Sequence, residues 1–252
     1  MADNNRSYRA VFSSDWSECL SPNGPFDPIS FLCPELAGEP ADIFRRYTGN
    51  EIPLAAAWES IRALVPAPIT MEGMDAYLEA EFKTYSGVRE LIEWCDAHDV
   101  FVMINTTGSK GYFQRALAKN LLPHVPAVSA NPLISFGQCG DDGRFACEVH
   151  EIDDKPRCTS SVLQSLGIPA SKLVIMGDSG GDGPHFEWGA SVGAVLVASM
   201  PKASLLKFCS DKGVSINRLF GVVYGPGEVR RLDEELSVDF MALREIIESV
   251  ST

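Results

Sequence analysis

The sequence predicts an α/β fold with a doubly wound parallel sheet. Short apolar runs bounded by turn-forming residues alternate along the chain with segments whose apolar residues recur at helical spacing. Polar residues follow several of these runs directly, as is typical of strands that end at a ligand-binding edge. The 252 residues, 45% of them hydrophobic, are enough to bury a core without disulfides or structural metals.

Each predicted element rests on a local pattern. Cys95 shares one helix face with three upstream apolar residues, and the helix before Gly167 ends at a residue suited to a C-cap. The predicted strands are residues 8–12, 100–104, 173–176, 192–197 and 219–224, and the predicted helices between them are residues 88–97, 112–121 and 158–166.

Two segments interrupt this alternation. Residues 22–85 contain helical patterns at 41–47, 54–64 and 71–84, punctuated by Pro53, Pro66 and Pro68, and have no strand pattern. We therefore expect an all-helical insertion after the first strand. Residues 131–150 are rich in glycine and end in an alternating run, for which we expect a small β-hairpin or an irregular excursion.

Composition limits the kinds of partner that the protein is expected to bind and the compartment in which it is expected to work. The formal net charge of −13 argues against binding to nucleic acid or to an anionic membrane surface. Seven cysteines without a CxxC pair favour neither a zinc knuckle nor a complete disulfide framework, so we expect reduced thiols in a cytoplasmic protein. No secretory leader and no apolar run of about 18 residues is apparent in the sequence.

The most informative motif is KLVIMGDSGGDG at residues 172–183. An apolar run ends in Gly177, and Asp178 and Asp182 follow it, so a buried strand would deliver two carboxylates to its carboxyl end. Carboxylates packed this closely repel one another unless a cation neutralises them, and oxygen ligands on a tight loop suit Mg²⁺. The alternative is a solvated acidic turn after a strand.

Further polar residues follow the other strands. Asp15 follows the first strand, Thr106 and Thr107 the second, and Lys155 opens the helix before the third element. A carboxylate can attack phosphorus, while a hydroxyl and an ammonium group can bind the phosphoryl oxygens. Together with a metal held by Asp178 and Asp182, these residue types suit phosphoryl transfer.

In the order of these motifs the chain resembles the haloacid dehalogenase-like (HAD) superfamily, over residues 11–190. Its phosphoserine-phosphatase-like branch carries a helical cap between the first two motifs, which matches a cap at 22–85 and a Rossmann-like core at 1–21 and 86–252. The resemblance implies Mg²⁺-dependent hydrolysis of a small phosphorylated metabolite. The residues that match are Asp15 as nucleophile, Thr106, Thr107, Gly108 and Lys155 at the phosphate, and Asp15, Ser17, Asp178 and Asp182 at the metal.

The first motif departs from the family pattern. The family's phosphatases carry a second Asp two residues after the nucleophile, where this chain has Ser17, and Cys19 replaces the usual Thr. Losing a general acid and base typically slows such a reaction about 10²–10⁴-fold. The backbone carbonyl of Ser17 remains a possible metal ligand.

Two alternatives therefore stay open. One is a non-catalytic domain of this fold that binds a phosphorylated ligand or a protein partner, which the serine at position 17 favours. The other is phosphonate or carbon–halogen hydrolysis, although the insertion offers only Lys83 for a Schiff base. The sequence does not identify the substrate or the oligomeric state, but Arg45, Arg46 and Arg62 of the insertion are suited to a carboxylate or a second phosphate.

Overall fold

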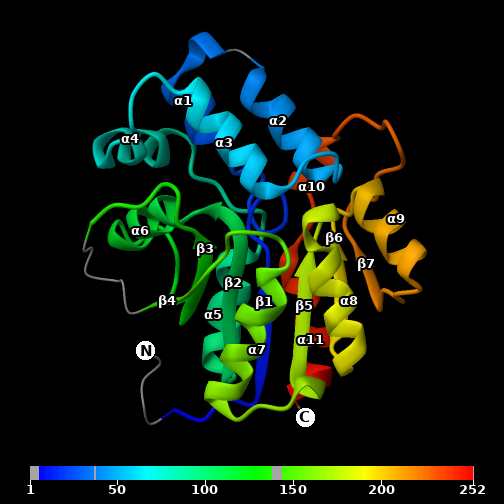
Figure 1. Ribbon diagram of the computed structural model, residues 1–252. Helices are drawn as coiled ribbons and strands as arrows, with labels where there is room; N and C mark the ends of the chain where they lie inside the picture. Colours follow the sequence, from blue (N-terminus) through cyan, green and yellow to red (C-terminus); the bar gives the residue numbers. More distant parts are fainter. Residues whose placement is uncertain (1–5, 37, 138–143, 252) are drawn as a thin grey trace.

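The protein folds around one parallel sheet. The computed structural model describes residues 6–36, 38–137 and 144–251. In this part of the chain, seven strands run in the order β4-β3-β2-β1-β5-β6-β7, and every pair of neighbours is parallel (Figure 1). The strands are β1 (Ala10–Ser14), β2 (Val100–Ser109), β3 (Ala127–Asn131), β4 (Phe145–Glu148), β5 (Leu173–Gly177), β6 (Val195–Ser199) and β7 (Arg218–Phe220).

Strand β1 lies at the point where the direction of winding reverses. It pairs with β2 on one side and β5 on the other, with Ser14 opposite Ile104 and Met176. The chain builds the β2-β3-β4 side first and then returns to build β5-β6-β7. At such a point the adjacent loops diverge and leave a crevice at the carboxyl ends of the strands, so the residues after Ser14 are placed at a ligand-binding position.

Helices cover both faces of the sheet (Figure 1). Successive residues of β2 enter two different apolar clusters, Val102 and Ile104 one of them, Phe101 and Met103 the other. Both faces of the central strands are therefore buried, as is expected of a parallel sheet. The helices of this part are α5 (Val88–Ala97), α6 (Lys110–Ala118), α7 (Asp154–Leu166), α8 (Gly183–Val192), α9 (Ala203–Lys212), α10 (Leu232–Leu236) and α11 (Arg244–Ser251).

The segment between β1 and α5 is helical, as the sequence predicts. It lies beyond the carboxyl ends of the strands (Figure 1), and no strand occurs among its described residues. Its helices are α1 (Asp27–Leu32), a short 3₁₀ turn at Pro34–Leu36, α2 (Glu39–Thr48), α3 (Leu54–Leu64) and α4 (Met71–Glu81).

Hydrogen bonds of charged side chains join this helical segment to the part of the chain that forms the sheet. Arg115 of α6 donates two hydrogen bonds to Asp75 of α4, at 2.7 and 2.8 Å. Glu151 accepts the Leu54 and Ala55 backbone N–H groups at 3.1 and 3.0 Å, so a carboxylate caps the start of α3. An acid at a helix N-terminus both fills free donors and complements the helix dipole.

The sequence prediction was wrong at one edge of the sheet. Residues 127–131 form β3, which the sequence analysis did not identify, and the alternating run at 145–149 contains β4, which pairs in parallel with β3 and is no hairpin arm. Alternation arises here because β4 is an edge strand with one face partly exposed. Residues 138–143 of the predicted excursion lie outside the described residues. The fifth predicted strand is shorter than expected, since β7 ends at Phe220.

The helix predictions hold closely. Helix α5 spans the predicted residues, and Gly167 caps α7 in the left-handed region, with φ of 67°. Within the described residues, no helix combines the length and the apolar character needed to cross a membrane.

Candidate active site

Asp15 directly follows β1, and hydrogen bonds hold both its backbone and its side chain in place. Its backbone N–H donates to the Met176 carbonyl of β5 at 2.9 Å, and its Oδ1 accepts the Trp16 backbone N–H at 2.6 Å. The residue is only 6% exposed. Burial raises the pKa of Asp15, which the positive charge of Lys155 opposes. The predicted nucleophile is therefore a buried, oriented carboxylate.

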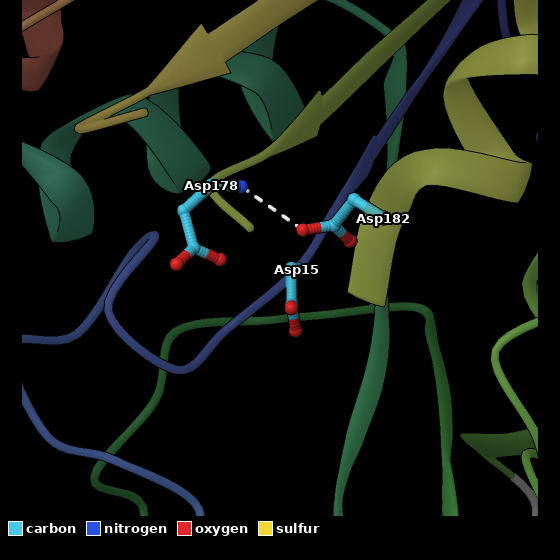
Figure 2. Close-up of side chains that lie close together, drawn as sticks. All are labelled: Asp15, Asp178 and Asp182. Atoms are coloured by element: carbon cyan, nitrogen blue, oxygen red, sulfur yellow. Dashed lines mark hydrogen bonds between the residues drawn. The ribbon is translucent and has the colours of Figure 1, made fainter. Parts of the chain in front are cut away.

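The loop after β5 folds back on itself and orients Asp182. The Asp182 Oδ2 atom accepts the backbone N–H groups of Asp178, at 2.9 Å, and of Ser179, at 3.3 Å. Figure 2 shows the first of these bonds and the three carboxylates of Asp15, Asp178 and Asp182 gathered around one region. A Cβ atom on Gly177 would lie 2.4 Å from Asp182 Cγ, so this loop requires glycine at that position.

Lys155 joins two of the carboxylates. Its side chain is completely buried, and Nζ lies 2.6 Å from Asp182 Oδ1 and 3.1 Å from Asp15 Oδ2. Burial alone would lower the pKa of Lys155, but the two carboxylates raise it above its ordinary value, so the ammonium stays charged. Burial would likewise raise the pKa of Asp182, and Lys155 instead holds it below its ordinary value.

Asp178 has a second cation that the sequence analysis missed. Lys202, in the loop after β6, places Nζ 2.9 Å from Asp178 Oδ2 and also forms an ion pair with Glu18. Arg230 donates to the other oxygen of Glu18 at 2.9 Å. A usable signal was present, since Lys202 follows a predicted strand just as the other site residues do.

The three carboxylates suit a hard divalent cation. Asp15, Asp178 and Asp182 offer oxygen atoms that all lie within 4.8 Å of one another. Burial, together with the neighbouring carboxylates, raises the pKa of Asp178 to about 8 despite Lys202. The buried Asp178 Oδ2 atom faces the Lys202 ammonium at 2.9 Å, and its carboxylate completes an all-oxygen donor set of the kind that hard divalent cations prefer.

The second strand is longer than the sequence predicts, so Thr106 and Thr107 lie within β2 and not after it, and the two hydroxyls have different partners. Side-chain hydrogen bonding from Thr106 lowers the pKa of Asp15, whereas that from Thr107 acts on Tyr47, a residue of helix α2. The Gly108 backbone N–H donates to Thr106 Oγ1 at 3.2 Å. Thr106 is therefore the hydroxyl beside the predicted nucleophile. The hydrogen bond between Thr107 and Tyr47 was not apparent from the sequence.

Ser17 lies beside the end of β2, since a Cβ atom on Gly108 would lie 3.8 Å from Ser17 Oγ. It is 8% exposed and lines a small cavity with Trp16 and Gly108. Cys19 is also buried, and burial raises the pKa of its thiol well above the ordinary value, so it is a poor nucleophile. Burial lowers the pKa of His185 to about 3, and this neutral ring hydrogen-bonds Thr159.

Comparison with solved structures identifies the fold. A phosphoserine phosphatase with a phospho-aspartyl intermediate analogue has a TM-score of 0.68 and 14% identity, covering 95% of this chain and 99% of that chain. A substrate-bound phosphoserine phosphatase has a TM-score of 0.67 and 14% identity, covering 94% and 97%. A HAD family hydrolase from Salmonella enterica serovar Typhi has a TM-score of 0.65 and 12% identity, covering 96% and 73%.

Comparisons of sequence gave no such match. No family model matches the chain, and no curated protein matches it. At 12–14% identity the likeness to solved structures establishes the architecture, and it extends over nearly the whole chain. The chain therefore has the fold of the HAD-like hydrolases, in the arrangement of the phosphoserine phosphatase structures.

Proposed function

We propose that the protein is a metal-dependent phosphatase of small phosphate monoesters, acting through an aspartyl-phosphate on Asp15. The observation that carries this proposal is the buried Asp15 carboxylate, which lies at a strand end 3.1 Å from Lys155 Nζ and within 4.8 Å of oxygen atoms of Asp178 and Asp182. A structural ion pair would require only one carboxylate for one lysine. Three clustered carboxylates at the winding reversal of the sheet favour a site that binds a cation and an anion together.

The chain's own residues account for most of the chemistry. The Asp15 carboxylate attacks phosphorus, the bond from phosphorus to the leaving oxygen breaks, and that oxygen takes a proton from water. A second water then hydrolyses the aspartyl-phosphate, releasing inorganic phosphate and restoring Asp15. Lys155 and Thr106 are placed to bind phosphoryl oxygens as negative charge shifts among them.

Mg²⁺ is the cation we propose for this site. Asp15 and Asp178 would hold it, with the Ser17 carbonyl as a further ligand and Asp182 supporting it through water or directly. When bound, it would reduce the repulsion between the phosphate ester and the carboxylates.

The helical segment is proposed to be a cap over this site. We assign residues 22–85 to the cap and residues 1–21 and 86–252 to the core, since α1–α4 lie beyond the strand ends that carry the site residues (Figure 1). A site covered by helices favours a small metabolite as substrate over a macromolecule. The six described cysteines are free, which supports a reducing compartment such as the cytoplasm.

The test compares wild type with Asp15→Asn and with Asp211→Asn, a change at an exposed aspartate far along the chain. With p-nitrophenyl phosphate and Mg²⁺, wild type and Asp211→Asn should turn over, whereas Asp15→Asn should lose at least about 10²-fold, since it removes the nucleophile. Equal turnover in all three proteins would refute the role of Asp15. Ser17→Asp, which adds the missing acid, should raise the rate on esters with poor leaving groups.

A further inference from the structure

Tyr47 brings a hydroxyl group from the helical segment into the candidate active site. It lies near the end of α2 and is 3% exposed. A Cβ atom built on Gly181 would lie 2.6 Å from the Tyr47 hydroxyl oxygen, so this oxygen rests directly against the acidic loop. Thr107 hydrogen-bonds the phenol, and the charges of Lys155, Asp15 and Asp182 act on it.

The paired glycines of the acidic loop make this approach possible. A Cβ atom on Gly180 would lie 2.5 Å from Asn50 Nδ2 and 2.8 Å from the Thr48 carbonyl oxygen. Side chains at Gly180 and Gly181 would thus displace the last turn of α2 together with the residues that follow it. Glycine at both positions therefore allows α2 to pack against the loop and also allows the loop to turn.

The phosphoryl group of the proposed reaction needs more donors than Lys155 offers. Its ammonium group has three N–H donors, and it already contacts both Asp182 and Asp15. Burial raises the pKa of Tyr47, so the phenol stays protonated and remains a hydrogen-bond donor at neutral pH. Its hydroxyl hydrogen-bonds the Thr107 hydroxyl, which can rotate to accept or donate.

We propose that Tyr47 donates a hydrogen bond to a phosphoryl oxygen of the bound ester, so that the phosphate site is complete only when α2 is docked on Gly180 and Gly181. This inference rests on the proposed phosphatase function. It assigns to the helical segment a direct part in binding the reacting group, in addition to covering it. Thr106, Lys155 and Tyr47 then surround the phosphoryl group from β2, α7 and α2.

The first experiment measures binding of inorganic phosphate, with Mg²⁺ present, by titration calorimetry. Tyr47→Phe removes only the hydroxyl. Tyr77→Phe is the matched control, since Tyr77 lies on α4 and its hydroxyl accepts a hydrogen bond from Asn23 at 3.2 Å. We expect Tyr47→Phe to weaken phosphate binding about 10-fold or more, the usual effect of losing a hydrogen bond to a charged group. Binding within twofold of wild type, and equal to that of Tyr77→Phe, would overturn the proposal.

The second experiment separates phosphoryl binding from proton donation. If Tyr47 binds a phosphoryl oxygen, Tyr47→Phe should reduce kcat/KM by similar factors for p-nitrophenyl phosphate and for an alkyl phosphate. A loss confined to the alkyl ester would instead make Tyr47 the proton donor to the leaving oxygen and would overturn the proposal. Wild type that binds phosphate but turns over neither ester would contradict the phosphatase function alone, since the binding arm still tests Tyr47.

A double-mutant cycle tests the docking contact. Gly181→Ala should displace the Tyr47 hydroxyl and weaken phosphate binding, and in the Tyr47→Phe background the same change should have a much smaller effect. Additive losses would show that the two positions act independently and would contradict the contact as the means of completing the site.

Discussion

Replacing Lys155 by methionine tests whether the buried ion pairs hold the site together. Methionine keeps most of the length and apolar contact of the lysine stem but removes its charge. Lys155 is fully buried, and both of its partners, Asp15 and Asp182, have side chains no more than 8% exposed. The variant therefore leaves two nearby carboxylates buried without their common cation.

The expected loss of stability follows from that burial. Removing one partner of a buried ion pair costs about 3–5 kcal/mol, because the remaining charge is left uncompensated. For a chain of this length, 1 kcal/mol shifts Tm by about 2–4 °C, so the variant should melt about 6–20 °C below wild type. Lys207→Met is the matched control, since the Lys207–Asp211 pair has side chains 75% and 59% exposed and its loss should cost less than about 0.5 kcal/mol.

Urea denaturation in the presence of a chelator measures this difference without a divalent cation to replace the lysine charge. Lys155 holds the pKa of Asp182 below its ordinary value, so this pairing stabilises wild type above the ordinary pKa and is lost as the pH falls. In the variant, protonation also removes the charge of the unpaired carboxylates. The difference in unfolding free energy between wild type and variant should therefore be smaller at pH 4 than at pH 7. A deficit below about 1 kcal/mol at pH 7, or one that grows in acid, would refute the reasoning.

Two further predictions concern the acidic loop and its second cation. Gly177→Ala should destabilise the protein by about 1–3 kcal/mol in urea denaturation, because its Cβ would overlap Asp182, whereas Gly38→Ala, with no atom within 4 Å of the added Cβ, should change stability by less than about 0.5 kcal/mol. Burial would raise the pKa of Glu18, but Lys202 and Arg230 hold it below the ordinary value of 4.5. The stability difference between wild type and Glu18→Gln should therefore be fully present at pH 6–7 and shrink progressively as the pH falls below 4.5, and a difference independent of pH would contradict these ion pairs.

Patterns that are local in the chain could be read correctly from the sequence. The apolar run before Gly177 predicts β5, and the polar residues after it are the acidic loop, because a buried strand must end in a turn before the next helix. The same logic places Asp15 after β1, whereas Thr106, expected to follow the second strand, lies within the last residues of β2. Parallel strands bring their carboxyl ends to one edge, so these residues had to converge.

Edge strands were harder to predict for a physical reason. The alternation at 145–149 shows that one face is exposed, but it carries no information on the direction of the partner strand. Direction is decided by the path between β3 and β4, which only the assembled sheet reveals. The missed strand β3 has the sequence AVSAN, in which Val128 is the only large apolar residue, so it gives no apolar run.

The sequence by itself determined the fold class, the helical insertion and the acidic residues at the strand ends, because hydrophobic periodicity and turn residues act over a few neighbouring positions. Only the tertiary structure decided which cations meet those acids. Lys202 and Tyr47 reach the site from segments distant in the chain. Their roles depend on burial and on close contacts with the acidic loop. Periodicity does not encode such distances, since they arise only when the loop after β6 and the helical insertion meet the carboxyl edge of the sheet.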